Sequence, residues 1–534
     1  MNLRIGIDFD NTLANYERVF SKAAIDLDVI SSDWKGGKKE LRDHIRTLDN
    51  GETIWQKLQG KVYGKFMKDA ELYPGVSEFL WKCKLSKTEV FIVSHKTIFG
   101  HFDEEKINLR SVASDWMQAQ GFFRDSEYSI KNENVFFAET RSEKIQKINS
   151  LNLDFFIDDL IEVFVEDEFN LHTKKILFSN SIHHEYSNFD GVVLQSWRKI
   201  LGHIFQNLNE IDIQKILSEK WTDLQGSELK LIKANGNSRV FQLGNLSNSY
   251  LLKIYPDLQF DNRKRLHVEF SSSEKLYRSG VNVPLPVYLD ENLNWGLYSW
   301  IEGSAIDEVN EQLILKLIDI VISLKKISEE SKLDSNFQAS EACLCPSDIE
   351  KQIQHRLLAL KVVEHSDLQE FLSIEFEPVY ESNLANIKKH FKNNYNSTLN
   401  QEYRILSPSD FGFHNAKLNS NGELYIFDLE YFGWDDPVKL IADFVWHPAM
   451  KISQTLKNLW IEKTIELFSQ DPDIGIRFEL YKPMIGLRWV LIILNEFLKK
   501  KLENRTNANP DKTANLNIIQ NEQLRKAKQL LSEI

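Results

Sequence analysis

The chain has 534 residues, which is too long for a single ordinary core. Of these residues 42% are hydrophobic and 27% charged, the composition of a soluble globular protein. Its formal net charge of −13 argues against a broadly basic surface and so disfavours sequence-independent nucleic-acid binding. Three cysteines (Cys83, Cys343 and Cys345), no secretory signal pattern and no apolar stretch long enough to cross a bilayer indicate a cytoplasmic protein without a membrane span.

The first 200 residues alternate apolar runs with helical segments. Buried strands are expected at residues 3–8, 89–93, 134–138, 154–157 and 175–178. Because helical stretches separate these strands, we expect an α/β domain with a Rossmann-like, doubly wound parallel sheet. The polar, mainly helical segment from about 13 to 72 is too long for a connecting loop, so it is expected to form a small cap inserted after the first strand.

Polar side chains directly follow three of the predicted strands. Asp8 closes the first strand, Ser94 follows the second, and the pair Asp158 and Asp159 follows the fourth. Ligands of open parallel sheets bind beyond the carboxyl ends of the strands, so we expect these groups to meet in one crevice. Their hard oxygen atoms are suitable ligands for Mg²⁺.

The segment DFDNT, which contains Asp8, Asp10 and Thr12, resembles the first motif of the haloacid dehalogenase-like (HAD) hydrolases, D-x-D-x-T. On its own, a D-x-D after a strand is often only a capped turn. Three further motifs of that family have matches in the expected order within residues 1 to about 200: Ser94 for the second, Lys144 for the third, and Asp158 with Asp159 for the fourth.

Lys144 stands 14 residues before Asp158. Lys147 is the alternative for the third motif, since it lies one helical turn further along.

The resemblance implies a phosphatase that forms an aspartyl phosphate. Asp8 would be the nucleophile, and Asp10 would protonate the leaving oxygen and then activate water. In that family the second aspartate indicates a phosphatase rather than a dehalogenase. The other implied roles are phosphate binding by Thr12, Ser94 and Lys144, and Mg²⁺ coordination by Asp8, Asp10, Asp158 and Asp159.

The second half of the chain begins with a helical segment at 201–220, which we expect to link two domains. Strands are expected at 238–243 and 249–255 around a GNLSN turn, and again in VPLPVYL and WGLYSWIEG, with a helix at about 262–279 before them. After Asp307 the pattern is almost entirely helical, apart from short strands around Asp410 and at 425–428. A bilobal α+β domain is therefore predicted, with a strand-rich lobe at about 221–303 and a mostly helical lobe at about 304–534.

The segment SPSDFGFHNA has the spacing of a kinase catalytic loop. Asp410 stands five residues before Asn415, and Asp428 follows the predicted strand YIF. No GxxxxGK[ST] occurs in the chain, which excludes a Walker-type kinase.

A lysine that grips nucleotide phosphates is expected upstream of that loop. Lys253 in YLLKIY is the candidate, with Glu269 on the following helix as its partner and Glu274 as the alternative.

The order ANGNSRVFQLG, YLLKIY, HVEF, GVNVPLPVYL, YSWIEG and SDFGFHN resembles the aminoglycoside phosphotransferase and choline kinase family over about residues 220–534. The resemblance implies a protein-kinase-like fold and ATP as phosphoryl donor. Its implied roles are deprotonation of an acceptor hydroxyl by Asp410, Mg²⁺ binding by Asn415 and Asp428, phosphate binding by Lys253 with Glu269, and adenine contacts through the backbone of Ile301 and Glu302.

Two features depart from that family. Pro408 and Ser409 replace the usual His-Gly before the catalytic aspartate, and the loop NGNSR is less glycine-rich than the phosphate-covering loop of protein kinases. Neither change removes a charged group that phosphoryl transfer requires.

These patterns together predict a bifunctional enzyme with domains at 1–200 and 221–534. The first would hydrolyse a phosphomonoester with Mg²⁺, and the second would use ATP to phosphorylate a hydroxyl of a sugar or amino-alcohol type metabolite. Two alternatives stay open. In one, a single domain is catalytic and the other is a ligand-binding regulator. The weaker one is a nucleic-acid end-processing phosphatase and kinase, which the acidic charge and absent P-loop disfavour.

Overall fold

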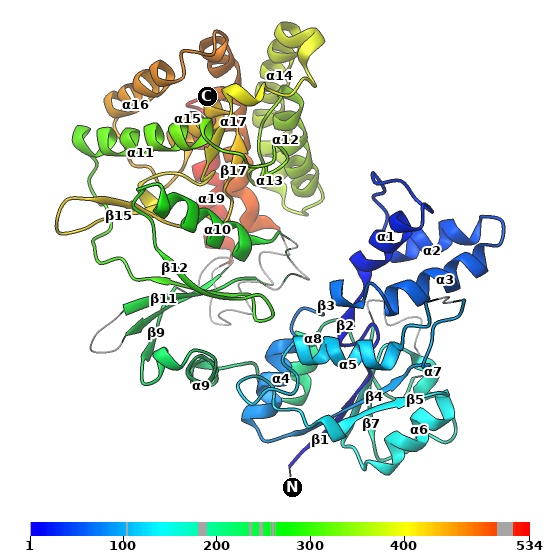
Figure 1. The fold of residues 1–534 in the computed structure, drawn as a ribbon. Helices are drawn as coiled ribbons and strands as arrows, with labels where there is room; N and C mark the ends of the chain where they lie inside the picture. The colour runs from blue at the N-terminus through cyan, green and yellow to red at the C-terminus, as the bar shows by residue number, and fades with distance from the viewer. Residues whose placement is uncertain are drawn as a thin grey trace. The chain divides into compact units, whose positions relative to one another are not determined.

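The computed structural model describes residues 2–102, 105–179, 189–233, 238–244, 249–256, 258, 261, 263–498 and 516–534 (Figure 1). The predicted NGNSR loop at 235–239 and the GNLSN turn at 244–248 lie mostly outside this part of the chain. The chain divides into two compact units. Unit 1 consists of Met1–Leu229, Asp257–Asn262 and Glu291–Leu293, and unit 2 of Lys230–Pro256, Arg263–Asp290 and Asn294–Ile534.

Unit 1 contains a six-stranded sheet in the order β5-β4-β1-β6-β7-β8, and every neighbouring pair is parallel. The parallel sheet predicted from the alternating pattern is therefore present, with the edge strand β8 in addition. Its strands are β1 (Arg4–Ile7), β4 (Glu89–His95), β5 (Val135–Ala138), β6 (Phe155–Asp158), β7 (Lys174–Phe178) and β8 (Val192–Leu194).

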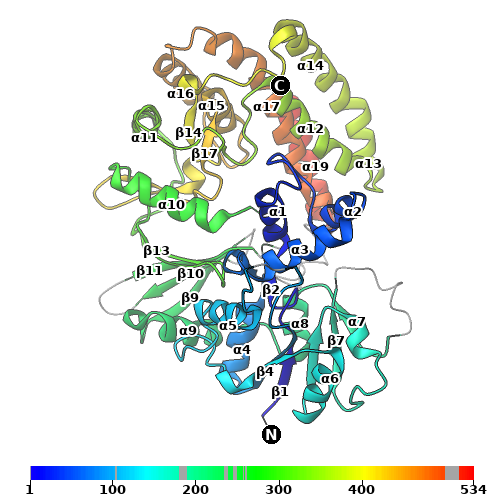
Figure 2. The ribbon, with the colours of Figure 1, turned by 45° about the vertical axis from the view of Figure 1, so that its right-hand side comes forward.

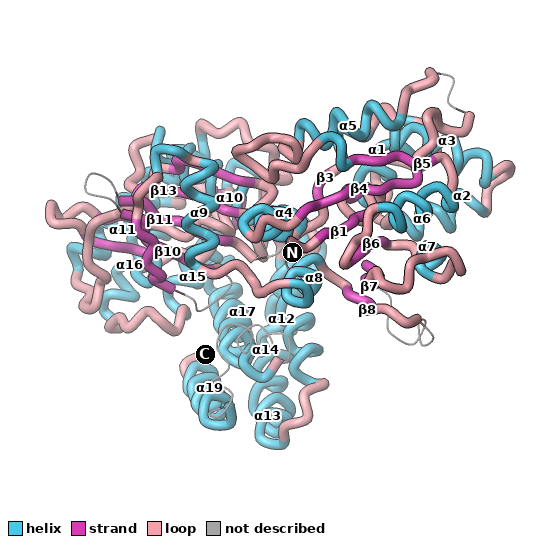
Figure 3. The backbone as a smooth tube through the Cα atoms, turned by 90° about the horizontal axis from the view of Figure 1, so that it is seen from below, coloured by secondary structure: helices cyan, strands magenta, loops and turns pink. Residues whose placement is uncertain are grey.

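Helices lie on both faces of this sheet, with α6 and α7 on one side and α4 and α8 on the other (Figure 3). Covering both faces explains why the central strands read as continuous apolar runs, since β1 and β6 have no solvated face. These helices are α4 (Val76–Leu85), α5 (Leu109–Ala119), α6 (Arg141–Ser150), α7 (Ile161–Phe164) and α8 (Trp197–Ile204). The segment predicted as a linker forms the end of α8 and then α9 (Glu210–Lys220), which packs against α4.

The inserted segment after β1 forms three helices, α1 (Glu17–Asp26), α2 (Lys38–Arg46) and α3 (Gly51–Tyr63). They pack on one another through buried aromatic side chains such as Phe20, whose ring stacks on that of Trp55. A short antiparallel pair, β2 (Ala14–Asn15) with β3 (Glu71–Leu72), closes the base of the insertion. The three helices lie at the end of the sheet opposite the amino terminus, beyond the carboxyl end of β1 (Figures 1 and 2). We call this insertion the cap.

Unit 2 begins with a five-stranded sheet in the order β12-β13-β11-β10-β9, in which the pairs β10 with β11, β11 with β13, and β12 with β13 are antiparallel. The helix α10 (Arg265–Arg278) packs against β12 and β13. The strands are β9 (Glu228–Lys233), β10 (Arg239–Gly244), β11 (Ser249–Ile254), β12 (Pro286–Asp290) and β13 (Trp295–Ser299).

The rest of unit 2 is mostly helical, as the pattern after Asp307 predicts, and one large apolar core runs through it. Its helices are α11 (Glu311–Glu329), α12 (Pro346–Lys361), α13 (Ser366–Glu370), α14 (Glu377–Phe391), α15 (Pro437–Trp446), α16 (Gln454–Leu467), α17 (Ile474–Ile493) and α19 (Leu516–Leu531). Two short antiparallel pairs interrupt them, β14 (Ile405–Ser407) with β17 (Gly433–Asp435), and β15 (Ala416–Leu418) with β16 (Leu424–Ile426). Within the described residues, no helix combines the length and apolar character needed to span a bilayer.

Candidate active sites

Three carboxylates of unit 1 gather at the carboxyl ends of β1 and β6. Asp8 follows β1, Asp158 is the last residue of β6, and Asp159 comes next. Their oxygen atoms include a set that lies within 4.8 Å of one another, and the side chain of Asp158 is fully buried. The parallel register brings them together, because the backbone N–H of Asp8 donates to the carbonyl of Ile157 at 2.8 Å.

Lys144 reaches this cluster from α6. Its Nζ lies 2.6 Å from Asp8 Oδ1 and 2.6 Å from Asp158 Oδ2, and the side chain is 2% exposed. Lys147, the alternative in the sequence, instead places its Nζ 3.6 Å from the centre of the Phe136 ring. The structure therefore brings Lys144 to the carboxylates and leaves Lys147 away from them.

The charge of the cluster favours a divalent cation. Burial raises the pKa of Asp8, and the neighbouring Asp158 adds to the shift, although Lys144 opposes it. Burial followed by the charges of Asp8 and Asp158 also raises the pKa of Asp159 well above its usual range. One lysine does not neutralise three carboxylates, and their oxygen atoms are the hard ligands that Mg²⁺ takes. Asp8, Asp158 and Asp159 therefore fit an Mg²⁺ site.

Two buried hydroxyl groups lie at the carboxyl-end edge of the sheet. Ser94 lies near the end of β4 and is 1% exposed, and its Oγ is a buried atom without a hydrogen-bond partner in the described structure. Thr12 is fully buried, with Oγ1 at 3.4 Å from Asp8 Oδ2 and from Asp159 Oδ1. A buried hydroxyl without a partner is costly for folding, so its retention at this edge of the sheet points to a ligand oxygen as its partner.

Asp10 points toward the cap. Its Oδ1 accepts a hydrogen bond from the Tyr16 hydroxyl at 2.5 Å, and its Oδ2 lies 2.8 Å from Lys96 Nζ. Asp10 is not among the clustered ligands formed by the other three carboxylates, although the sequence pattern assigns it to the metal as well. Tyr16 and Lys96 were not among the predicted site residues. Lys96 comes directly after the end of β4, which is the only sequence signal that places it at this edge of the sheet.

The cap also brings Lys38 to this region. Its Nζ donates to Asn11 Oδ1 at 2.6 Å, and burial lowers the pKa of Lys38, although Asp159 and Glu17 oppose the shift. Unit 1 thus brings lysines from the segment after β4, from α6 and from the cap to the acidic side chains at this edge of the sheet.

In unit 2, Lys253 on β11 forms a buried ion pair with Glu269 on α10. The two charged atoms lie 2.6 Å apart and each side chain is 8% exposed. The alternative partner, Glu274, pairs with Arg278 on the exposed face of α10. Lys253 also contacts Asp428 and, at 3.0 Å, Glu430. Burial opposes the charge on Lys253, but the three carboxylates outweigh it and raise its pKa well above the usual range.

Glu430 was not among the predicted site residues. It is 6% exposed and also pairs with the buried guanidinium of Arg265. Asp428 has φ of 66°, a left-handed conformation that aspartate tolerates better than most residues and that turns the chain sharply after β16. The backbone N–H of Phe427 donates to the carbonyl of Asn415 at 3.0 Å, so the β15–β16 pair brings Asn415 next to Asp428.

The loop after β14 carries Asp410. Asn415 Nδ2 donates to the backbone carbonyl of Asp410 at 3.0 Å, and among the interactions described Asn415 Oδ1 accepts none, so it can act as an oxygen ligand. This oxygen and the carboxylate of Asp428 fit an Mg²⁺ ion by ligand type.

Ser409 is one of the two residues that replace the usual His-Gly of the resembled family. It has φ of 67°, and its side chain makes two hydrogen bonds. Its Oγ donates to the Ser340 carbonyl at 3.3 Å and accepts from Lys439 Nζ at 3.1 Å. The unusual residue before Asp410 is thus anchored to the helical part of unit 2.

Two histidines contact the carboxylate of Asp410. His414 Nε2 lies 2.9 Å from Asp410 Oδ1, and His447 Nε2 lies 3.5 Å from the same oxygen. The imidazole rings are stacked, with centroids 3.9 Å apart and planes inclined by 7°. Burial raises the pKa of Asp410, but the hydrogen bond from His414 and the nearby imidazole of His447 outweigh it, so the pKa lies below its usual range.

The segment after β13, predicted to face adenine, contains Ile301 and Glu302. The carbonyl of Ile301 accepts a hydrogen bond from Lys417 Nζ at 3.3 Å, and Glu302 is exposed. The structure brings neither residue into contact with Lys253 or Asp410 through any interaction described.

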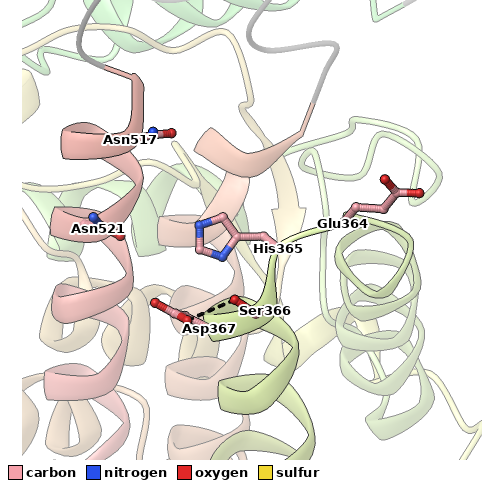
Figure 4. Close-up of a pocket in the computed structure, with 6 residues that line it drawn as sticks. All are labelled: Glu364, His365, Ser366, Asp367, Asn517 and Asn521. Atoms are coloured by element: carbon pink, nitrogen blue, oxygen red, sulfur yellow. Dashed lines mark hydrogen bonds between the residues drawn. The ribbon is translucent and has the colours of Figure 1, made fainter.

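A cavity of about 480 Å³ lies between the start of α13 and α19, away from these residues (Figure 4). It is open and polar, and it holds none of the predicted site residues. Its lining consists of Glu364, His365, Ser366, Asp367, Asn517 and Asn521.

No protein-family model matches the chain, and no curated protein matches it. Similar solved structures include choline kinase LicA from Streptococcus pneumoniae, at 14% identity and TM-score 0.40, covering 60% of this chain and 99% of that chain. A gentamicin–APH(2″)-IIa complex has 16% identity and TM-score 0.40 and covers 61% and 97%. Plasmodium vivax ethanolamine kinase has 15% identity and TM-score 0.40 and covers 59% and 93%. These likenesses do not assign the chain to a family.

Proposed function

We propose that unit 2 transfers a phosphoryl group from ATP to a hydroxyl of a small molecule. The observation that carries this proposal is the buried Lys253–Glu269 ion pair, which shares its lysine with Asp428 in the interior of unit 2. A lysine with three carboxylate neighbours stays protonated, and Glu269 holds it in place. Such a fixed cation suits nucleotide phosphates, and the spacing of Asp410, Asn415 and Asp428 supports the same chemistry.

In the proposed reaction, Lys253 binds the phosphates and Asp410 accepts the proton of the acceptor hydroxyl as its oxygen attacks the γ-phosphorus. The bond between that phosphorus and the bridging oxygen of ADP breaks, and ADP leaves with the electron pair. Asn415 and Asp428 would hold Mg²⁺, which supplies charge neutralisation at the phosphates. Asp410 suits its role because its low pKa keeps it ionised near neutral pH.

The test is ATP-dependent phosphorylation of a panel of sugars and amino alcohols by the full chain. Asp410→Asn and Lys253→Met should each abolish turnover of any acceptor found. Glu274→Gln is the matched control, because Glu274 lies on α10 like Glu269 but is exposed and paired with Arg278. Full phosphorylation activity in Asp410→Asn would refute the proposal.

A second function, in unit 1, is favoured by a separate observation. Asp8, Asp158 and Lys144 converge at one edge of the parallel sheet, and the buried hydroxyl of Ser94 at the end of β4 has no partner in the described structure. We propose that unit 1 hydrolyses a phosphomonoester, as its resemblance to the HAD hydrolases implies. Mg²⁺ bound by the carboxylates would offset the repulsion between Asp8 and the substrate.

The proposed hydrolysis has two steps. A carboxylate oxygen of Asp8 attacks phosphorus, the bond to the substrate oxygen breaks, and Asp10 gives that oxygen its proton. Water then attacks the phosphorus of the aspartyl phosphate while Asp10 takes a proton from it, which releases phosphate and restores the Asp8 carboxylate and the protonated form of Asp10. Ser94 and Lys144 bind the phosphoryl oxygens throughout.

The test is phosphate release from a panel of phosphorylated metabolites in the presence of Mg²⁺. Asp8→Asn should abolish release, and Lys147→Ala should leave it intact, because Lys147 lies on the same helix as Lys144 but packs on Phe136. Two substitutions distinguish these proposals from the alternative in which one unit only regulates the other. Asp8→Asn and Asp410→Asn should each remove one activity and leave the other, whereas a regulatory unit would have no turnover of its own.

A further inference from the structure

Asp410 receives two imidazoles on a single oxygen. His414 comes from the short 3₁₀ turn at Phe413–Asn415, and His447 follows the last residue of α15. Both Nε2 atoms face Asp410 Oδ1, at 2.9 and 3.5 Å. Two elements of unit 2 that are distant in the sequence therefore converge on one carboxylate oxygen.

The hydrogen bonds determine where the ring protons lie. The backbone N–H of Ala449 donates to His447 Nδ1 at 3.2 Å, so this nitrogen carries a lone pair and the proton of the neutral ring is on Nε2, facing Asp410. Burial, reinforced by His414, lowers the pKa of His447 to about 4, which keeps the ring neutral. His414 Nδ1 is a buried atom without a partner in the described structure, whereas its Nε2 lies within hydrogen-bond distance of Asp410.

The same three side chains have the ligand types of a transition-metal site, since Asp410, His414 and His447 offer ligand atoms within 4.8 Å of one another. Metal binding by His447 Nε2 would move the ring proton to Nδ1, where the N–H of Ala449 already points. Two donors would then face each other. The arrangement therefore favours two N–H groups on a carboxylate over a metal ion.

Neighbouring side chains hold the His447 ring in place. The Trp489 ring meets the His447 ring edge-on, with centroids 4.6 Å apart, and Trp489 Nε1 donates to Asp443 Oδ1 at 2.8 Å. Asp443 is 5% exposed and also pairs with Arg488 and Lys439. His447 is thus supported by a buried charged network that joins α15 to α17.

We propose that His414 and His447 are positioning residues that fix Asp410 for phosphoryl transfer. Their Nε2 atoms both lie against Oδ1, at 2.9 and 3.5 Å, which restricts rotation of the carboxylate and leaves Oδ2 to take the proton of the acceptor hydroxyl. The inference rests on the kinase function proposed for unit 2. It adds that the catalytic base is held by two imidazoles. His414 lies within the segment SDFGFHN, where the sequence pattern assigns it no role, and His447 lies outside every motif named above.

The test uses the full chain with Mg-ATP and water as the acceptor, measured as steady-state ADP formation. His414→Phe and His447→Phe keep an aromatic ring but remove the N–H. Each should lower kcat about tenfold to a hundredfold while KM for ATP stays within about twofold. His414→Gln and His447→Gln place an amide N–H near the position of Nε2 and should recover most of the lost kcat. A purely structural role predicts no such rescue.

The outcomes distinguish failure of the positioning inference from failure of the proposed kinase function. If Asp410→Asn forms ADP at the wild-type rate, the proposed kinase function fails. If Asp410→Asn is inactive but both phenylalanine variants keep the wild-type kcat, the positioning inference alone is overturned. Where a phenylalanine variant does not fold, an asparagine at that position replaces it, because its amide is too short to reach Asp410 Oδ1. Inhibition by Zn²⁺ that the phenylalanine variants relieve would overturn the inference in favour of a metal site.

Discussion

Lys96 Nζ lies 2.8 Å from Asp10 Oδ2 in the interior of unit 1, and the lysine side chain is 2% exposed. Tyr16 donates to the other oxygen of the same carboxylate. Asp10, the proposed general acid and base, is therefore held by a cation from the segment after β4 and a hydroxyl from the cap. Lys96 therefore contacts a proposed catalytic carboxylate directly, although no sequence motif includes it.

Lys96→Met should destabilise unit 1 and impair the proposed phosphatase activity, because it leaves a largely buried carboxylate without its cation. We expect the free energy of unfolding to fall by about 2–3 kcal/mol, measured by urea denaturation. Lys35→Met, at an exposed position of the cap, is the control. An unchanged unfolding midpoint in Lys96→Met would show that the ion pair contributes nothing to stability.

Ser94→Ala should raise the stability of unit 1 and lower its rate of phosphate release. The mutation removes a buried hydroxyl that has no partner in the described structure, so we expect unit 1 to be stabilised by up to about 1 kcal/mol. Phosphate release should nevertheless fall about tenfold to a hundredfold, because a donor to the phosphoryl oxygens is lost. Ser86→Ala, at an exposed position after α4, should change neither quantity. A marked loss of stability in Ser94→Ala would contradict the assignment.

Magnesium should stabilise unit 1 in the absence of nucleotide. Binding to three carboxylates relieves their repulsion, and at a concentration about ten times Kd the gain is about 1.4 kcal/mol, visible as a higher Tm. Asp158→Asn removes one ligand and should abolish most of the increase, whereas Asp167→Asn on the surface should not. An equal increase in all three proteins would place the bound ion elsewhere.

Glu269→Gln should weaken ATP binding without removing Lys253, the lysine proposed to bind the nucleotide phosphates. With its main partner neutral, Lys253 turns toward Asp428 and Glu430, and its Nζ is no longer held in one position. We expect KM for ATP to rise about tenfold, whereas Glu274→Gln should have the wild-type value. Titration with a fluorescent nucleotide checks the change directly, and equal affinity in the two variants would show that the ion pair does not position Lys253.

His447 should make unit 2 sensitive to acid. Burial and the neighbouring His414 lower its pKa to about 4, although Asp410 and Asp443 oppose the shift. The unfolded chain, with an ordinary pKa of about 6.5, therefore binds the proton first as pH falls. The stability that His447 contributes is complete above about pH 6.5 and declines toward pH 4, by up to about 3 kcal/mol.

The measurement is Tm against pH. His447→Gln cannot titrate, so its Tm should fall less steeply across this window than that of the wild type. His355→Gln, at an exposed position of α12, is the control and should follow the wild-type curve. Parallel curves for His447→Gln and the wild type would contradict the prediction.

The order of apolar runs and polar residues along the chain was enough to predict the parallel sheet. It also predicted most of the polar side chains at the carboxyl ends of the strands. A run of apolar residues that ends in Asp8 or Asp158 indicates both a buried strand and the edge where its last side chain lies. Lys144 could be selected by its spacing from Asp158, but only the packing of α6 shows that Lys144, and not Lys147, faces the carboxylates.

The groups that the sequence did not reveal depend on contacts between distant segments. Glu430 meets Lys253 and Arg265 only because β16 and its turn lie beside β11 and α10. His447 follows α15, and its proximity to Asp410 depends on how that helix packs after β17. No periodicity or motif carries such information, since each of these residues alone has the pattern of an ordinary core or surface position.

The cap enters and leaves the sheet at one place. Ala14 and Leu72 are register partners in the β2–β3 pair, so the two ends of the insertion are already adjacent before any cap helix begins. A short glycine-containing turn joining these two residues would complete the hairpin and leave the order of the six-stranded sheet unaltered. The cap is therefore an insertion whose two ends already meet at the sheet, so its length and helices can vary without a change in the strand order that positions Asp8 and Asp158.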